Sequence, residues 1–170
     1  MEYLIVTAAD KGGPYEDCIK EQRKIQGENF LGMIVPSRGS WAENTKIKPD
    51  AIRAGFQFCN VVLWVDADCY VDPPESLPPG DWDICTTKNI HPLHKIKISA
   101  GFILLRNTKR TVKFLKLWDL LNSKAKKDHP ALIKALKMMR NEAQIDDMTE
   151  WIKGRHTINK FNPSRGMHAG

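Results

Sequence analysis

The first half of the chain alternates between short apolar runs and apolar residues at helical spacing. Continuous runs of aliphatic and β-branched residues predict strands at residues 3–7, 30–35 and 61–65. Between them, side chains that recur every three or four positions predict a helix at 15–26 and another that begins at Pro49. Strands that alternate with helices are typical of a mostly parallel sheet with helices on both faces.

The second half continues with strands and then becomes helical. A loop rich in proline and glycine separates the first half from strands predicted at residues 83–87 and 98–105. Helices are predicted at 108–123, 130–140 and 142–153, and residues 154–170 are expected to form a loop. We therefore predict one α/β domain over residues 1–170, with a Rossmann-like sheet in 1–105 and a small helical segment with the C-terminal tail in 106–170.

Composition and charge narrow the classes of function. The balance of 42% hydrophobic and 27% charged residues is that of a globular domain. The net charge of +6 comes largely from lysines at helical spacing in the second half, a pattern typical of a solvated helix face, and no nucleic-acid-binding motif accompanies them. No apolar run is long enough to span a membrane and no signal peptide is recognisable, so a cytoplasmic protein is expected. Four cysteines without a C-x-x-C pair are expected to be reduced thiols, mostly buried.

The chemistry-bearing motif is Asp66-Ala67-Asp68, which directly follows five apolar residues, Val61 to Val65. Such a run is typical of a central strand, and ligands of an open α/β sheet bind at the carboxyl ends of its strands. The one-residue spacing can direct both carboxylates into one small volume, where they repel unless a cation joins them. Mg²⁺ or Mn²⁺ prefers such oxygen ligands. An acidic strand end is also a common solvated turn, so the triplet alone leaves both interpretations open.

Three segments together resemble a known family. Val62 to Asp68 resembles the D-x-D signature of nucleotide-diphospho-sugar glycosyltransferases of the GT-A fold. Lys48-Pro49-Asp50-Ala51-Ile52 resembles their lysine-led helix, and Ser99-Ala100-Gly101-Phe102, which leads to Arg106-Asn107-Thr108, resembles their N-A-G-F-x-x-x-R-N-T strand. The resemblance spans roughly residues 3–152. It departs at Ser99, where relatives often carry Asn.

The resemblance implies a metal-dependent, hexosyltransferase-like enzyme with a nucleoside-diphosphate sugar as donor, expected to be a UDP-sugar, and an unknown acceptor. It implies Mn²⁺ or Mg²⁺ on Asp66 and Asp68. The residues that it places around the donor are Thr7, Ala8, Ala9, Lys48, Asp66, Ala67, Asp68, Ser99, Ala100 and Gly101. The pair Asp146-Asp147 resembles an acidic element near the transferred sugar, which implies a catalytic role. Met167-His168-Ala169-Gly170 resembles an H-x-G segment that would make His168 a third metal ligand and would favour retention of anomeric configuration.

Other readings remain open. A phosphatase of the haloacid-dehalogenase type also places D-x-D after an apolar strand, as nucleophile and general acid. That family prefers Thr or Val where this chain has Tyr70, usually opens with the motif, and places its later acidic pair after a strand rather than in a helix. A catalytically inactive nucleotide-sugar-binding module is a second alternative, because 170 residues leave little room for an acceptor site. A nucleic-acid binder is the third.

Overall fold

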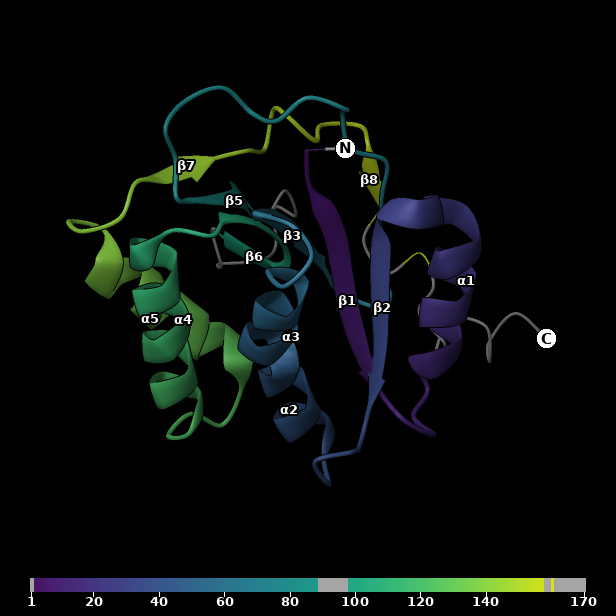
Figure 1. The fold of residues 1–170 in the computed structure, drawn as a ribbon. Coiled ribbons are helices and arrows are strands. Elements are labelled where there is room, and N and C mark those ends of the chain that lie inside the picture. Colours follow the sequence, from purple (N-terminus) through teal and green to yellow (C-terminus); the bar gives the residue numbers. More distant parts are fainter. Residues whose placement is uncertain (1, 89–97, 158–159, 161–170) are drawn as a thin grey trace.

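A six-stranded mixed sheet forms the centre of the computed structural model, which describes residues 2–88, 98–157 and 160 (Figure 1). Its order is β2-β1-β3-β6-β5-β7. The strands are β1 (Leu4–Asp10), β2 (Phe30–Val35), β3 (Val61–Val65), β5 (Ile84–Lys88), β6 (Ile98–Arg106) and β7 (Ile145–Asp147). Strand β6 is antiparallel to β3 and β5, and the other neighbouring pairs are parallel. The predicted mostly parallel α/β sheet is therefore confirmed.

Helices cover both faces of this sheet, as predicted. They are α1 (Glu16–Gln26), the short α2 (Trp41–Asn44), α3 (Lys48–Gly55), α4 (Lys109–Asn122) and α5 (Asp128–Met139), with 3₁₀ turns at η1 (Gly27–Asn29) and η2 (Thr45–Ile47). Successive side chains of a strand point to opposite faces. Val62 and Trp64 of β3 accordingly pack in the cluster that α3, α4 and α5 cover, whereas Leu63 packs in a cluster on the other face. On that second face Ile19 of α1 packs against Ala9 of β1.

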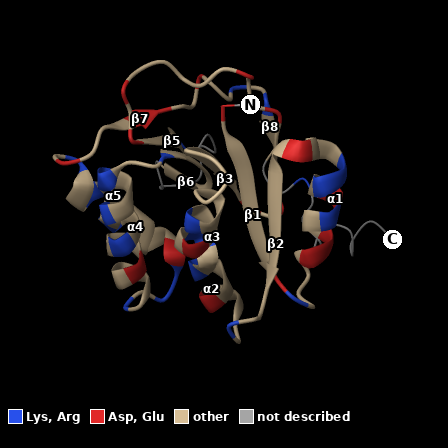
Figure 2. Cartoon of the chain, viewed as in Figure 1, with Lys and Arg blue, Asp and Glu red and all other residues tan. Residues whose placement is uncertain are grey.

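Local signals account for the helix boundaries. Pro49 lies in the first turn of α3, where its missing N–H costs no hydrogen bond. The Thr108 hydroxyl caps α4 by accepting a hydrogen bond from the backbone N–H of Thr111. Phe114 and Trp118 follow on the buried side of α4. The lysines and arginines of α4 and α5 lie on the exposed sides of these helices (Figure 2).

The helix predicted at 142–153 is wrong. Residues Ile145–Asp147 instead form β7, which extends the sheet in parallel beside β5, so the C-terminal part of the chain contributes to the sheet. The apolar residues Ile145, Met148 and Ile152 have helical spacing, but they do not share one stripe. Ile145 packs on the face covered by α3 to α5, whereas Met148 and Ile152 pack on the opposite face. Backbone pairing with β5 outweighed the local periodicity.

A second, two-stranded sheet was not predicted. Strand β4 (Tyr70–Val71) pairs antiparallel with β8 (His156–Thr157), so part of the expected C-terminal loop is ordered. None of the four cysteines, all of which lie in the described residues, forms a disulfide; Cys59 is partly exposed and the other three are buried. Within the described ranges, no helix has the length and apolar character needed to cross a membrane.

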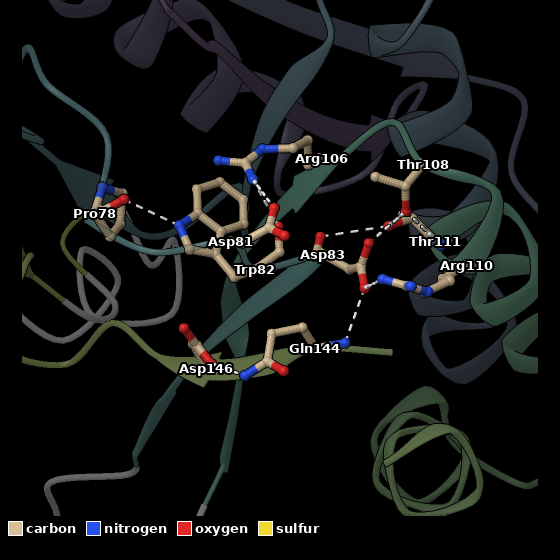
Figure 3. Close-up of polar contacts among 10 residues, drawn as sticks. All are labelled: Pro78, Asp81, Trp82, Asp83, Arg106, Thr108, Arg110, Thr111, Gln144 and Asp146. Atoms are coloured by element: carbon tan, nitrogen blue, oxygen red, sulfur yellow. Dashed lines mark hydrogen bonds and ion pairs between the residues drawn. The ribbon is translucent and has the colours of Figure 1, made fainter. Parts of the chain in front are cut away.

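The buried carboxylate of Asp83 connects three segments near the β7 edge of the sheet (Figure 3). Asp83, which directly precedes β5, accepts hydrogen bonds from the Thr108 hydroxyl at 2.7 Å, the Gln144 backbone N–H at 2.8 Å and the Arg110 guanidinium at 3.3 Å. Burial acts to raise the pKa of Asp83, but these donors outweigh it and hold the pKa below its usual value. One side chain thereby joins β5, the start of α4 and the approach to β7.

Candidate functional site

An open pocket of about 130 Å³ lies where β1 and β3 end. Five segments form it: the end of β1, the residue that precedes α1, the α2–η2 segment, the first residue of α3 and the end of β3. Its lining residues are Ala8, Ala9, Asp10, Tyr15, Trp41, Asn44, Thr45, Ile47, Lys48, Trp64, Asp66, Ala67 and Asp68. The carboxyl ends of parallel strands are the expected ligand site of an open α/β sheet. The pocket thus brings together six of the predicted donor-binding residues, namely Ala8, Ala9, Lys48, Asp66, Ala67 and Asp68.

The carboxylate of Asp66 is held in one orientation. Its Oδ1 accepts a hydrogen bond from the Trp64 indole Nε1–H at 2.9 Å and lies 2.9 Å from the Lys48 ammonium. The backbone N–H of Asp66 donates to the carbonyl of Gly101 at 2.9 Å, and its carbonyl accepts from the Cys69 N–H at 2.9 Å. In the part of the chain that the structure describes, no donor reaches Oδ2 of Asp66, which leaves that oxygen free for a ligand.

Lys48, the first residue of α3, is buried and surrounded by oxygen atoms. Its Nζ lies 2.9 Å from Asp66 Oδ1, 2.9 Å from Asp128 Oδ2 and 3.3 Å from the carbonyl oxygen of Ala100. Burial acts to lower the pKa of Lys48, but the charges of Asp66 and Asp128 outweigh it and raise the pKa. An ammonium group has three protons to donate. Three oxygens therefore surround the ammonium, and Lys48 acts on the site through Asp66.

Asp68 forms no ion pair with another described residue. Burial, and next the neighbouring charge of Asp66, raise the pKa of Asp68 above its usual value. Tyr15 lines the same pocket. Burial, and next the charge of Asp68, raise the pKa of its phenol. A cation bound between the two carboxylates would relieve this repulsion.

The donor set fits a hard divalent cation. Mg²⁺ is usually held by one or two carboxylates and completes its octahedral shell with water and substrate phosphate oxygens. Asp66 and Asp68 border the same pocket and supply the carboxylates. Within residues 2–88, 98–157 and 160, no group of three or more potential ligands is assembled. The predicted third ligand, His168, lies outside the described residues.

The remaining predicted donor-binding residues lie beside the pocket rather than in its lining. Thr7 is fully buried, and its hydroxyl has no hydrogen-bond partner in the described chain. The Ser99 hydroxyl accepts a hydrogen bond from the Gly101 N–H at 3.1 Å. The carbonyls of Ala100 and Gly101 hold Lys48 and the Asp66 backbone. This strand therefore contacts the D-x-D segment through its backbone.

Asp146 and Asp147 do not line the pocket. Strand β7 is separated from β3 by β6 and β5, which is three inter-strand spacings or about 14 Å. Asp146 accepts a hydrogen bond from the Gln144 side chain at 3.0 Å (Figure 3). Asp147 pairs with Lys88 at 3.0 Å and accepts from the Thr149 backbone N–H at 2.9 Å. Strand β7 is parallel to β3 and ends at Asp147. Asp147 therefore lies at the same carboxyl ends of the parallel strands as the D-x-D segment, although three strands away.

Four functional candidates were missed in the sequence. Tyr15 and Trp41 give the pocket two aromatic side chains. Trp64 contacts Asp66 directly, and alternation along the strand was a usable signal because positions i and i+2 share a face. Asp128 had no local signal, since only the packing of α5 brings it to Lys48.

Comparison with known proteins supports the fold. No protein-family model matches the sequence, and no curated protein matches it either. Among solved structures, a glycosyltransferase involved in glycosylation of the major capsid of PBCV-1 superposes with a TM-score of 0.66 at 15% identity, covering 98% of this chain and 100% of that chain. This chain has the fold of a GT-A-type glycosyltransferase. The apo form of the glycosyltransferase GlyE from Streptococcus pneumoniae gives a TM-score of 0.52 at 14% identity, covering 87% of this chain and 46% of GlyE.

This fold confirms the expected resemblance, and it changes one argument about the phosphatase alternative. That alternative was disfavoured partly because Asp146 and Asp147 were expected in a helix, and they lie in strand β7. Two sequence features still argue against a phosphatase: Tyr70 stands in place of Thr or Val, and the motif comes late in the chain. The likeness of the fold to a solved glycosyltransferase structure is a third.

Proposed function

We propose that this protein is a metal-dependent glycosyltransferase that transfers a sugar from a UDP-sugar to an acceptor. The observation that carries the proposal is the position of Asp66 and Asp68. They follow the central strand β3 and border an open pocket in a fold shared with solved glycosyltransferases. Mn²⁺ or Mg²⁺ would be held by Asp66 Oδ2 and by the Asp68 carboxylate.

The pocket suits a nucleoside diphosphate. The small side chains of Ala8 and Ala9 let a ribose lie close to the end of β1, while Tyr15 and Trp41 offer aromatic surface to a base. Trp41 is 57% exposed although it is large and apolar, so a stacking partner would cover surface that is otherwise in water. The diphosphate would then lie toward Asp66 and Asp68.

The residues at the strand end would stabilise charge that develops during transfer. Breaking the bond between the anomeric carbon and the diphosphate leaves negative charge on the departing nucleoside diphosphate. A divalent cation at the site supplies the Lewis acid that neutralises this charge. Asp68 and Asp66 would hold that positive charge in place. Because two donors on Oδ1 fix the orientation of Asp66, its Oδ2 could bind the cation without rearrangement during the reaction.

Thermal stabilisation by a panel of nucleoside diphosphates, with and without Mn²⁺, tests the donor site. UDP at about 100 times its dissociation constant should stabilise the fold by about 2.7 kcal/mol, which for a chain of this size raises the melting temperature by roughly 5–11 °C. The shift should require Mn²⁺ and should disappear in Asp68→Asn. Stabilisation that is independent of metal, or an unchanged shift in the variant, would contradict the assignment.

Turnover separates an enzyme from an inactive binding module. Incubation with UDP-sugars and Mn²⁺ should release UDP, slowly with water as acceptor and faster when the correct acceptor is added. Binding of UDP with Mn²⁺ without any release of UDP from a panel of UDP-sugars and acceptors would instead indicate a nucleotide-sugar-binding module. The control is Asp68→Asn, which should release none.

A further inference from the structure

A row of three charged side chains behind the D-x-D motif links α5 to the proposed metal site. The row runs from Asp128 through Lys48 to Asp66, with 2.9 Å separating the ammonium from each carboxylate. Lys48 and Asp128 are each only 5% exposed, whereas the Asp66 side chain retains 31% of its exposure. Of these three side chains, only Asp66 is therefore open to the pocket.

Stability alone does not account for these residues. A buried ion pair adds little net stability compared with apolar side chains of the same volume, because both charges must leave water. Asp128 lies at the first position of α5, where the helix dipole favours a negative charge. Lys48 lies at the first position of α3 and reaches across to β6 and the end of β3. Two helix ends thus place opposite charges directly behind Asp66.

As a result, the two carboxylate oxygens of Asp66 differ in their partners. Oδ1 receives the Trp64 indole N–H and the Lys48 ammonium, so it is saturated with donors. Oδ2 has no donor in the described part of the chain and lies toward Gly101, whose added Cβ would be 3.6 Å away. Only Oδ2 is left to bind a cation.

The charges of Asp128, Lys48 and the D-x-D pair also sum to a value that suits a divalent cation. Three carboxylates (Asp66, Asp68 and Asp128) and one ammonium (Lys48) give a net charge of −2, since three negative charges and one positive charge are present. Without Asp128 the sum is −1, and the ammonium would have Asp66 as its remaining carboxylate partner. Lys48 would then compete with the cation for Asp66.

We propose that Asp128 is a positioning residue for cation binding: it shares the Lys48 ammonium with Asp66 and so limits how far Lys48 neutralises that carboxylate. Lys48 and Trp64 together fix Asp66 with Oδ2 left for the metal. This inference rests on the proposed metal site and goes beyond it, because it assigns a role in metal affinity to residues that do not touch the metal. Removing partners that orient metal ligands typically costs 10–100-fold in metal affinity.

Mn²⁺ titration followed by electron paramagnetic resonance of the free ion tests the proposal, with Mn²⁺ alone and with Mn²⁺ plus inorganic pyrophosphate. Asp128→Asn should raise the Mn²⁺ dissociation constant by about tenfold or more, and Asp128→Glu should recover part of the affinity. The matched control is Asp119→Asn on the neighbouring helix, which removes an ion pair with Arg53 remote from the pocket lining. It should leave the dissociation constant unchanged.

Circular dichroism and melting curves establish that each variant is folded. If Asp128→Asn does not fold, Trp64→Phe decides, because it retains an aromatic ring in place of the indole and removes the N–H that reaches Asp66 Oδ1. It too should weaken Mn²⁺ binding. An Mn²⁺ dissociation constant within about twofold of the wild-type value in the folded variants overturns the positioning role alone. Absence of Mn²⁺ binding in the wild type overturns the metal site as well.

Discussion

Replacing Asp83 with Asn tests whether the buried carboxylate at the sheet edge holds the fold together. Its two oxygens have different partners: Oδ1 accepts from the Thr108 hydroxyl, and Oδ2 accepts from the Gln144 N–H and from Arg110 (Figure 3). An amide retains one acceptor oxygen and replaces the other with an NH₂ group. In Asp83→Asn the bond from Thr108 can persist, whereas the Gln144 N–H loses its acceptor and faces another donor.

The expected cost follows from that single loss. The Gln144 N–H takes part in a partly buried hydrogen bond, and a buried donor left without a partner costs about 1–3 kcal/mol. The Arg110 side chain is 60% exposed, so its ion pair adds little. We expect the free energy of unfolding to fall by about 2 kcal/mol, a large part of the 5–15 kcal/mol that is typical of a folded domain. The melting temperature should fall by about 4–8 °C.

Urea unfolding at pH 7 gives the measurement, and Asp81→Asn gives a matched control. Asp81 is two residues earlier and fully exposed, and its ion pair with Arg106 is 3.6 Å long. The same chemical change there should leave the unfolding midpoint unchanged. If the two variants have the same midpoint as the wild type, the network of Asp83 does not stabilise the fold and the reasoning is refuted.

Acidification supplies an independent check on the same residue. The pKa of Asp83 is lowered in the folded state, so its contribution is fully present above the unfolded pKa, which is about 3.9. That contribution is lost as pH falls toward the folded pKa. The difference in unfolding free energy between wild type and Asp83→Asn should therefore be constant from pH 7 to about pH 5 and shrink below about pH 4. A difference that grows on acidification would contradict the lowered pKa.

Two further substitutions probe the packing and the pocket. Gly55→Ala should lower the free energy of unfolding by about 1–3 kcal/mol, because the added Cβ would lie 2.7 Å from Val6 Cγ2 and 2.9 Å from Val62 Cγ2; an unchanged urea midpoint would show that α3 can shift. Trp41→Ala should weaken binding of UDP with Mn²⁺ roughly tenfold in calorimetry without lowering the melting temperature, whereas Phe58→Ala, which removes an exposed aromatic side chain outside the pocket lining, should leave affinity unchanged.

Most of the secondary structure could be predicted because its signals are local. The continuous run from Val61 to Val65 needs burial on both faces, and β3 occupies the middle of the sheet. The stripes of α4 and α5 match the observed helices to within about two residues, the usual uncertainty of helix ends. The segment from Ile145 to Ile152 failed for the complementary reason. Its apolar spacing fits a helix, yet its side chains pack on opposite faces of a sheet that the local sequence does not reveal.

The candidate site divides in the same way. The order of residues determined that Asp66 and Asp68 would follow a buried strand, and therefore that both would lie at a carboxyl edge where ligands bind. Lys48 was recognised because the segment from Lys48 to Ile52 resembles the lysine-led helix of the family, but its partners were not. Which oxygens surround its ammonium depends on where β6 and α5 pass in space.

The sequence by itself thus determined the alternation of strands and helices and the position of the acidic motif, because apolar periodicity and strand ends are encoded within a few residues. Only the tertiary structure decided that β7 completes the sheet, that Trp41 faces the pocket and that Asp128 lies behind Asp66. These contacts join residues far apart in the chain, and their distances are set by the packing of whole elements rather than by any local pattern.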